Sequence, residues 1–282
     1  MFLLPKFKKQ KGQTVLIILL IVAVILTVGL AAISSSISDI KVTQQTEEAS
    51  RAFYVAESAL EEHLLSPLGA QESGTIGDVD YVVSRLQQGG NEFLFPFKAE
   101  SNDPQIFWLI GHDDQGEMDL ATKYSDSSIS LYWTDSDSGE TPALAVAYVY
   151  NESGVYKVSR YNFDPDGERI GDNHFDPASS GSFSLGEKTF KYTATISDLE
   201  QGALIQPYFL KLTLLYNSTP QLIGVKPNGS SQLPNQGYCF VSTATVAQSG
   251  ITRKIKQCKL WQGLPAVFQW GLFSGGSLEK SD

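Results

Sequence analysis

The sequence predicts an α+β protein, in which one long N-terminal helix is followed by a mostly antiparallel β domain. Three observations predict this fold class. No residue from Gln13 to Ser38 carries a charged side chain. An amphipathic helical pattern continues beyond that segment, with no proline between Pro5 and Pro67. The remaining chain alternates short runs of β-branched and aromatic residues with turn residues, and hardly any part of it shows a helical pattern.

The segment Val15–Ile33 is long enough to cross a membrane. Its 19 residues are Val, Ile, Leu and Ala, interrupted only by Thr27 and Gly29. A helix rises about 1.5 Å per residue, so this length matches the roughly 30 Å hydrocarbon core of a bilayer. The alternative is a buried helix of a large soluble domain, which rarely contains so long an uninterrupted apolar run. We therefore predict a transmembrane part at about residues 14–37.

Beyond the apolar segment, the pattern becomes that of an amphipathic helix. Apolar residues recur at three- and four-residue steps, namely Ala49, Ala52, Phe53, Ala56, Ala59, Leu60 and Leu64. Five glutamates lie off this stripe, and Pro67 ends the pattern because proline disfavours helix at the residue before it. We predict a single helix over residues 13–66, roughly 80 Å long. Its first half requires lipid or other apolar helices around it, and its second half requires a globular domain.

The first 12 residues, MFLLPKFKKQKG, form a basic leader. They contain four lysines and no acidic residue. Positive charge before an apolar segment keeps that end in the cytoplasm, so the domain after the helix is expected outside. A secretory signal peptide has a shorter apolar core followed by a small-residue cleavage site. Here the small residue, Gly12, precedes the apolar core, so cleavage between Gly12 and Gln13 would leave the whole helix on the mature protein.

A short basic leader, a glycine and an uncharged helix, in this order, resemble type IV prepilins and type II secretion pseudopilins. The later stretch Arg51–Glu61, RAFYVAESALE, is similar to the RAFYAAEAGLE stretch of PilX-type minor pilins. The resemblance covers residues 6–65, under a quarter of the chain. It implies that a prepilin peptidase cleaves after Gly12, that the mature chain starts at Gln13, and that the helix packs among other pilins in a surface filament.

One position departs from the pattern of the major pilins. They carry Glu at the fifth mature position, where it meets the N-terminal amine of a neighbouring subunit, and this position is Ile17 here. The departure favours a PilX-type or type II secretion K-type subunit at or near the filament tip. Small residues such as Gly29 are expected to set close helix packing. The alternative function is a single-pass, membrane-anchored surface protein whose β domain binds a ligand.

Composition limits the classes of partner. The 282-residue chain has a formal net charge of −10, and loss of the four leader lysines would bring the mature chain to −14. Such bulk charge argues against nucleic-acid binding and suits an exported, solvated surface.

Residues 67–274 are predicted to form the extracytoplasmic β-rich region, large enough for one large or two small domains. The region begins with a polar link at 67–78, and a flexible tail at 275–282 follows it. The candidate strands are 79–86, 93–98, 106–110, 129–133, 143–151, 155–161, 189–196, 209–216, 221–225, 238–246 and 251–260. A four-residue turn at 151–154 is expected to join two of them.

The two cysteines, Cys239 and Cys258, are predicted to form a disulfide. They flank two strand-like runs around a turn that contains Ser249 and Gly250. A hairpin centred between Gln248 and Ser249 pairs residues whose numbers sum to 497, and the two cysteine numbers have this sum. They would lie directly opposite each other, about 4.5–5.5 Å apart at Cα, within reach of a disulfide.

The best metal candidate is the acidic segment with Asn162, Asp164, Asp166 and Glu168, which matches the front half of a calcium loop. The match fails at the twelfth position, where Asn173 replaces the expected bidentate Glu, so a solvated acidic turn is favoured. No sequence motif of a hydrolase, a nucleotide-binding loop or a Cys/His metal site occurs. We therefore predict a structural subunit that is not an enzyme and that requires no cofactor. His63 is expected at the surface or at the helix end.

Overall fold

The computed structural model describes residues 13–65, 71–199 and 201–263, with side chains from residue 15 onward and without that of residue 65. The leader and the tail at 275–282 lie outside the described residues. The chain divides into two compact units. Of the described residues, the first unit contains 13–62, 73–83 and 242–255. The second contains 63–65, 71–72, 84–199, 201–241 and 256–263.

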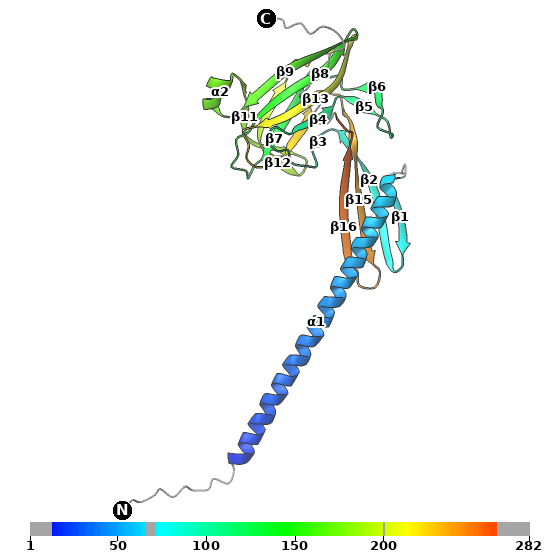
Figure 1. The fold of residues 1–282 in the computed structure, drawn as a ribbon, viewed down its shortest axis with the longest axis vertical. Coiled ribbons are helices and arrows are strands. Elements are labelled where there is room, and N and C mark those ends of the chain that lie inside the picture. The colour runs from blue at the N-terminus through cyan, green and yellow to red at the C-terminus, as the bar shows by residue number, and fades with distance from the viewer. Residues whose placement is uncertain (1–12, 66–70, 200, 264–282) are drawn as a thin grey trace, which may run out of the picture. The chain divides into compact units, whose positions relative to one another are not determined.

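The predicted α+β fold class is confirmed: one long helix precedes a chain rich in antiparallel strands (Figure 1). The helices are α1 (Gln13–Leu65) and α2 (Gly167–Asn173). The strands are β1 (Gln71–Ile76), β2 (Val79–Gly90), β3 (Phe93–Leu94), β4 (Pro104–Trp108), β5 (Ile110–His112), β6 (Met118–Lys123), β7 (Ile129–Asp135), β8 (Ala143–Glu152), β9 (Val155–Asp164), β10 (Asp176–Pro177), β11 (Ser179–Leu185), β12 (Lys188–Ile196), β13 (Ile205–Leu215), β14 (Ile223–Pro227), β15 (Leu233–Val246) and β16 (Thr252–Leu260).

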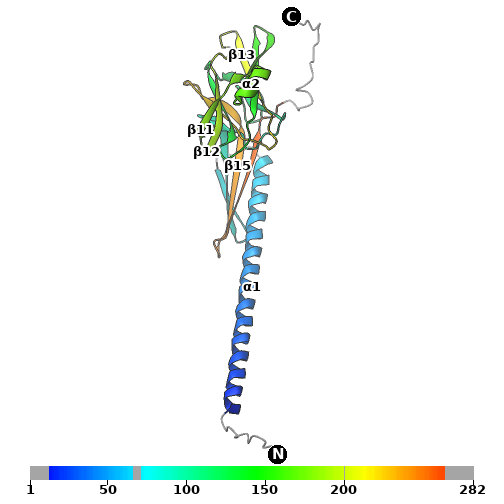
Figure 2. The same cartoon turned by 90° about the vertical axis from the view of Figure 1, so that its left-hand side faces the viewer.

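Helix α1 runs for 53 residues without a break (Figure 2). No proline interrupts it, and the hydroxyl groups of Thr27, Thr43, Thr46 and Ser50 donate to carbonyl groups of the preceding turn. Thr27 Oγ1, for example, donates to Val24 O at 2.9 Å, which satisfies a polar group inside the apolar segment. By length and composition α1 can cross a membrane, and it is compatible with a single-pass anchor.

The four-stranded sheet has the order β1-β2-β15-β16, and each of its four strands is divided between the two units. In the first unit, α1 lies beside the ends of this sheet (Figure 1). A small core joins the helix to the strands. It consists of Ala52, Ala56, Val79, Ala244 and Val246, with Val55, Tyr81 and Ile255 packed against it.

The second unit contains a β-sandwich. Its two five-stranded sheets have the orders β10-β9-β8-β13-β4 and β11-β12-β7-β14-β3. Buried side chains from both sheets form one core, among them Tyr148 and Leu212 from the first sheet and Leu131 and Trp133 from the second. Because side chains alternate along a strand, the other residues of β8, β9 and β13 face away from this core. A separate pair, β5 with β6, completes the sheets of the described residues.

Two local expectations differ from the structure. The predicted link at 67–78 contains β1, whose sequence QESGTI is too polar and Gly-containing to resemble a strand. The predicted four-residue turn at 151–154 is a two-residue turn, because Glu152 pairs with Val155. Ser153 and Gly154 both have positive φ, 54° and 90°, as this tight hairpin turn requires.

Candidate assembly surface

The N-terminal part of α1 presents a continuous exposed apolar surface. Every described side chain from Val15 to Ile40 is exposed, and no part of the most apolar stretch of α1 is buried. Ile17, at the predicted fifth mature position, is 49% exposed. Soluble proteins rarely expose an apolar surface this large, so the segment requires lipid or other apolar surfaces around it.

Gly29 lies at the floor of a hollow in this surface. The hollow has a volume of about 360 Å³ and is lined by Gly29 together with Val22, Ile25, Leu26, Leu30 and Ile33. A Cβ atom added at Gly29 would meet no atom within 4 Å, so nothing inside the described fold requires a glycine there. The missing side chain instead leaves a notch that another helix can approach closely.

The C-terminal part of α1 packs on the sheet through small residues. Ala52, Ala56 and Ala59 have 0% exposure, and Leu60 has 2%. Alanines on this face let the helix backbone approach the sheet closely. Phe53 was predicted on the buried stripe, but it is 43% exposed. The prediction was wrong for Phe53 because the buried face of the helix is narrow and contains only the positions 52, 56, 59 and 60 of the predicted stripe.

Arg51 fixes the helix to the β1–β2 turn. Its Nη1 donates to both carboxylate oxygens of Asp78, at 3.0 and 3.1 Å. The turn itself is tied to the β15–β16 turn, because Ala247 N donates to Asp78 O at 3.0 Å. The Arg51 and Asp78 side chains are 44% and 40% exposed, and exposed ion pairs add little to stability. The pair therefore serves mainly to orient the helix on the turn.

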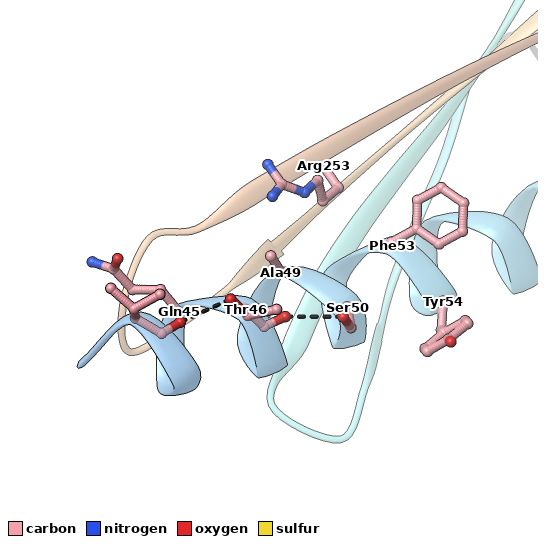
Figure 3. A pocket seen from close by; sticks show the side chains of 8 residues that line it. Gln45, Thr46, Ala49, Ser50, Phe53, Tyr54 and Arg253 are labelled. Carbon is pink, nitrogen blue, oxygen red and sulfur yellow. Dashed lines mark hydrogen bonds between the residues drawn. The ribbon is translucent and has the colours of Figure 1, made fainter. Parts of the chain in front are cut away.

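A second, more polar hollow of about 430 Å³ lies beside the packed part of α1 (Figure 3). It is lined by Val42, Gln45, Thr46, Ala49, Ser50, Phe53, Tyr54 and Arg253. Arg253 comes from β16, while the other residues come from α1, and the Phe53 and Tyr54 rings meet edge to face at 6.0 Å. Sequence reasoning missed Arg253, because only the hairpin register brings it to the helix. The exposed pair of Phe53 and Tyr54 was also not predicted, because Phe53 was expected to be buried on the apolar stripe.

Of the two residues predicted to flank a cleavage site, Gly12 lies outside the described residues, and Gln13 is the first described residue of α1. His63, expected at the surface or at the helix end, lies in the last turn of α1. Its side chain is 3% exposed, with Nε2 2.9 Å from Glu72 Oε2. This burial was not expected, because strand β1, which supplies Glu72, was not predicted.

The predicted disulfide between Cys239 and Cys258 is present, with 3.9 Å between the Cα atoms. The predicted register is also present. Val246 N donates to Ile251 O, and Trp261 N donates to Gln236 O. The two residue numbers of each pair add up to 497. Hydrogen-bonded pairs therefore fall at even-numbered positions of β15. Cys239 is odd-numbered, which places the cysteines at a non-hydrogen-bonded pair, where the strands approach most closely.

The calcium candidate residues have other roles in the structure. Asp164 is fully buried, and its carboxylate accepts from Arg169 Nη2 at 2.7 Å and from Asn173 Nδ2 at 2.7 Å. Asp166 caps the N-terminus of α2 by accepting from the backbone N–H groups of Glu168 and Arg169. Asn162 lines a different hollow. The residues that the structure describes contain no group of three or more His, Cys, Asp or Glu that could hold a metal ion.

Comparison of the sequence with protein-family models and with curated proteins gives no match.

Proposed function

We propose that this chain is a minor-pilin-like or pseudopilin-like structural subunit of a type IV pilus or type II secretion filament. The observation that supports it most is the division of α1. Its first part is exposed and uncharged, and its second part packs on a sheet through Ala52 and Ala56. A simple anchor needs only about 20 apolar residues. A helix that continues unbroken into a folded unit instead couples that unit rigidly to whatever surrounds the apolar part.

The proposed role has two stages. The helix first holds the chain in the cytoplasmic membrane with the C-terminal β domain outside. After a prepilin peptidase cleaves between Gly12 and Gln13, the helix leaves the lipid and packs among the helices of other pilins in a surface filament. Because lipid is itself apolar, this transfer gains little hydrophobic free energy. Close packing at notches such as the one at Gly29 then has to supply the attraction.

Ile17 supports a position at or near the filament tip. In the resembled family, Glu at this position answers the N-terminal amine of a neighbouring subunit, and an unpaired charge buried among apolar helices is costly. Ile17 has no carboxylate with which to do so. Such a subunit is tolerated once per filament, at an end, where that contact is absent.

Quantitative mass spectrometry of sheared filaments tests this proposal. We expect the chain to be present in the filament fraction at a small fraction of the copies of the major subunit, and immunogold labelling to mark filament ends. A stoichiometry near that of the major subunit, with labelling at intervals along the shaft, would contradict the tip position. Absence from filaments while the chain remains in the membrane fraction would contradict the subunit proposal itself.

A further inference from the structure

The outward face of the neighbouring strands β9, β8, β13 and β4 carries an apolar row that crosses all four strands. Trp108 of β4 pairs with Phe209 of β13, and Phe209 pairs with Val149 of β8. Val149 in turn pairs with Val158 of β9. Residues paired across neighbouring strands project on the same face. Their neighbours along the chain, such as Leu210, lie in the sandwich core, so the row faces away from that core.

This apolar row is open at its β9 end. Val158 is 52% exposed, and Tyr156, which projects on the same face of β9, is 69% exposed. The ring of Tyr156 lies 5.7 Å from the ring of Tyr208 in β13, so the surface rich in large side chains continues along the strands. The other members of the row are half-buried. Soluble domains rarely leave contiguous apolar surface uncovered, so this face indicates a binding site for an apolar partner.

The last described residues of the chain lie on the same outward face. After β16, Trp261 O accepts a hydrogen bond from Trp108 Nε1 at 3.3 Å. A Cβ atom added at Gly263 would lie 2.4 Å from Cγ1 of Ile106, so Gly263 lies directly against this side chain. Ile106 is two positions before Trp108 in β4 and projects on the same face. The described chain therefore ends on the β4 side of the outward face.

The sequence continues with an apolar segment. Residues 264–273, LPAVFQWGLF, lie outside the described residues, carry no charge and contain one polar side chain, that of Gln269. Ten residues can span at most roughly 33 Å, and three strand spacings add up to about 14 Å. The segment can therefore reach every strand of the row from Gly263. It can also offer a carbonyl group to the indole N–H of Trp261, which is buried without an acceptor among the residues that the structure describes.

We propose that residues 264–273 dock on the outward face of β9, β8, β13 and β4 in the same molecule and cover its apolar row. The segment begins where the chain already lies on this face, so a linked segment has a high effective concentration there that a second copy of the chain lacks. Both the segment and the row are apolar and uncharged, and their contact would remove both from water. This inference does not depend on the proposed filament role.

Photocrosslinking of the full chain tests this contact. A detergent micelle would compete for an apolar face, so the chain is held in lipid nanodiscs. Tyr156→p-benzoylphenylalanine places the photoreactive group on the outward face. Phe97→p-benzoylphenylalanine is the matched control, because Phe97 is also an exposed aromatic residue of the second unit, at 63%. It lies close to Ala99, which pairs with Gln221 beside β14 of the other sandwich sheet.

We expect the Tyr156 variant to crosslink to residues 264–273 of its own chain, as identified by peptide mass spectrometry, and the Phe97 variant to give no such product. An equal mixture of isotope-labelled and unlabelled chains separates products within one chain from products between two chains. The circular dichroism spectrum of each variant shows whether the fold is kept. Since Tyr156 is largely exposed, its replacement is expected to leave the fold intact.

Changes in the segment test which side chains make the contact. Phe268→Ser combined with Trp270→Ser is expected to lower the crosslinking yield about ten-fold or more, because it removes two large aromatic side chains from the docked surface. Leu278→Ser is the matched control, since it removes an apolar side chain outside residues 264–273, and it should leave the yield unchanged.

Four results would overturn the proposal. Products that join labelled to unlabelled chains would assign the face to a second copy. Products with lipid would assign it to the bilayer surface. A yield at Tyr156 no higher than that at Phe97 would show that the segment does not reach the face. A yield that survives the double substitution at Phe268 and Trp270 would show that apolar contact does not hold the segment there.

Discussion

Asp164 shows how one residue organises a loop of the second unit. Burial alone would raise the pKa of its carboxyl group. Hydrogen bonds from Arg169, from the Asp166 backbone N–H and from Asn173, together with the Arg169 charge, nevertheless hold that pKa below its ordinary value. Arg169 supplies the positive charge that a calcium ion would supply in a metal loop. The ring of Tyr216 lies under the same guanidinium, 4.7 Å away, and covers the ion pair.

Asp164→Asn is therefore expected to destabilise the protein by about 3 kcal/mol, because it leaves the Arg169 charge without its buried partner. The effect depends on pH. The pKa of an aspartate carboxyl group in the unfolded chain is near 3.9. When folding lowers that pKa, the group stabilises the folded state at any pH above about 3.9. This stabilisation is lost as the pH falls from there through the lowered pKa of the folded state. Urea unfolding between pH 7 and pH 3 should show the wild-type and variant curves converging at low pH. A constant difference across this range would contradict the assignment.

Single residues also show what the sequence could and could not predict. The cysteine pairing followed from a sum of residue numbers, because a hairpin with a short turn has only one symmetric register. The exposure of Phe53 could not be predicted in this way. Helical spacing predicts which face of α1 packs on the domain, but not how wide that buried face is. The width is set by the sheet, and this sheet includes β1, which the polar sequence QESGTI did not reveal as a strand. The pairing of Arg51 with Asp78 likewise depends on that hidden hairpin.

At the scale of elements, a disulfide links the two strands of the β15–β16 hairpin covalently. The disulfide joins Cys239 and Cys258, which are 19 positions apart in the sequence. Further along, the same hairpin supplies Ala244 and Val246 to the small core on α1. The disulfide restricts the unfolded chain by closing a loop of this length.

Replacing both cysteines by serine should lower the free energy of unfolding by about 2–4 kcal/mol, since the unfolded chain regains the entropy of that loop. Chemical denaturation of the oxidised protein and of the double variant measures the difference. Non-reducing peptide mapping provides the control by linking the two cysteine-containing peptides. Equal stability of the two forms would show that the bridge does not constrain the unfolded chain as expected.

Helix α1 offers a variant that separates folding from assembly. Gly29→Leu meets no neighbouring atom in the isolated chain, and replacing a helical glycine favours the helix by up to about 1 kcal/mol. Stability should therefore be kept, while incorporation into filaments, measured by immunoblotting of the sheared fraction, should fall several-fold because the notch is filled. Ala31→Leu is the matched control, since Ala31 lies on the opposite side of the helix and outside the hollow. Unchanged incorporation of Gly29→Leu would exclude the notch as a packing site.

At the scale of the whole molecule, composition predicted the coarse organisation well. The uncharged segment, the absence of proline between Pro5 and Pro67 and the alternating strands were enough to predict one long helix followed by antiparallel sheets. Helix α1 ends at Leu65, one residue before the predicted end. The sandwich in the second unit could not be predicted. It depends on which of many similar strands pair, and these pairings join residues far apart in the sequence.

The central claim is that the chain is processed and assembled as a pilin-like subunit, and the mature N-terminus tests it most directly. Intact-mass and N-terminal peptide mass spectrometry of the protein from cells with an active prepilin peptidase should show a chain that begins at Gln13. Gly12→Val should leave the leader in place, because the peptidase of the resembled family requires a small residue there. A wild-type chain that begins at Met1 in such cells would contradict the claim and favour a simple membrane-anchored surface protein.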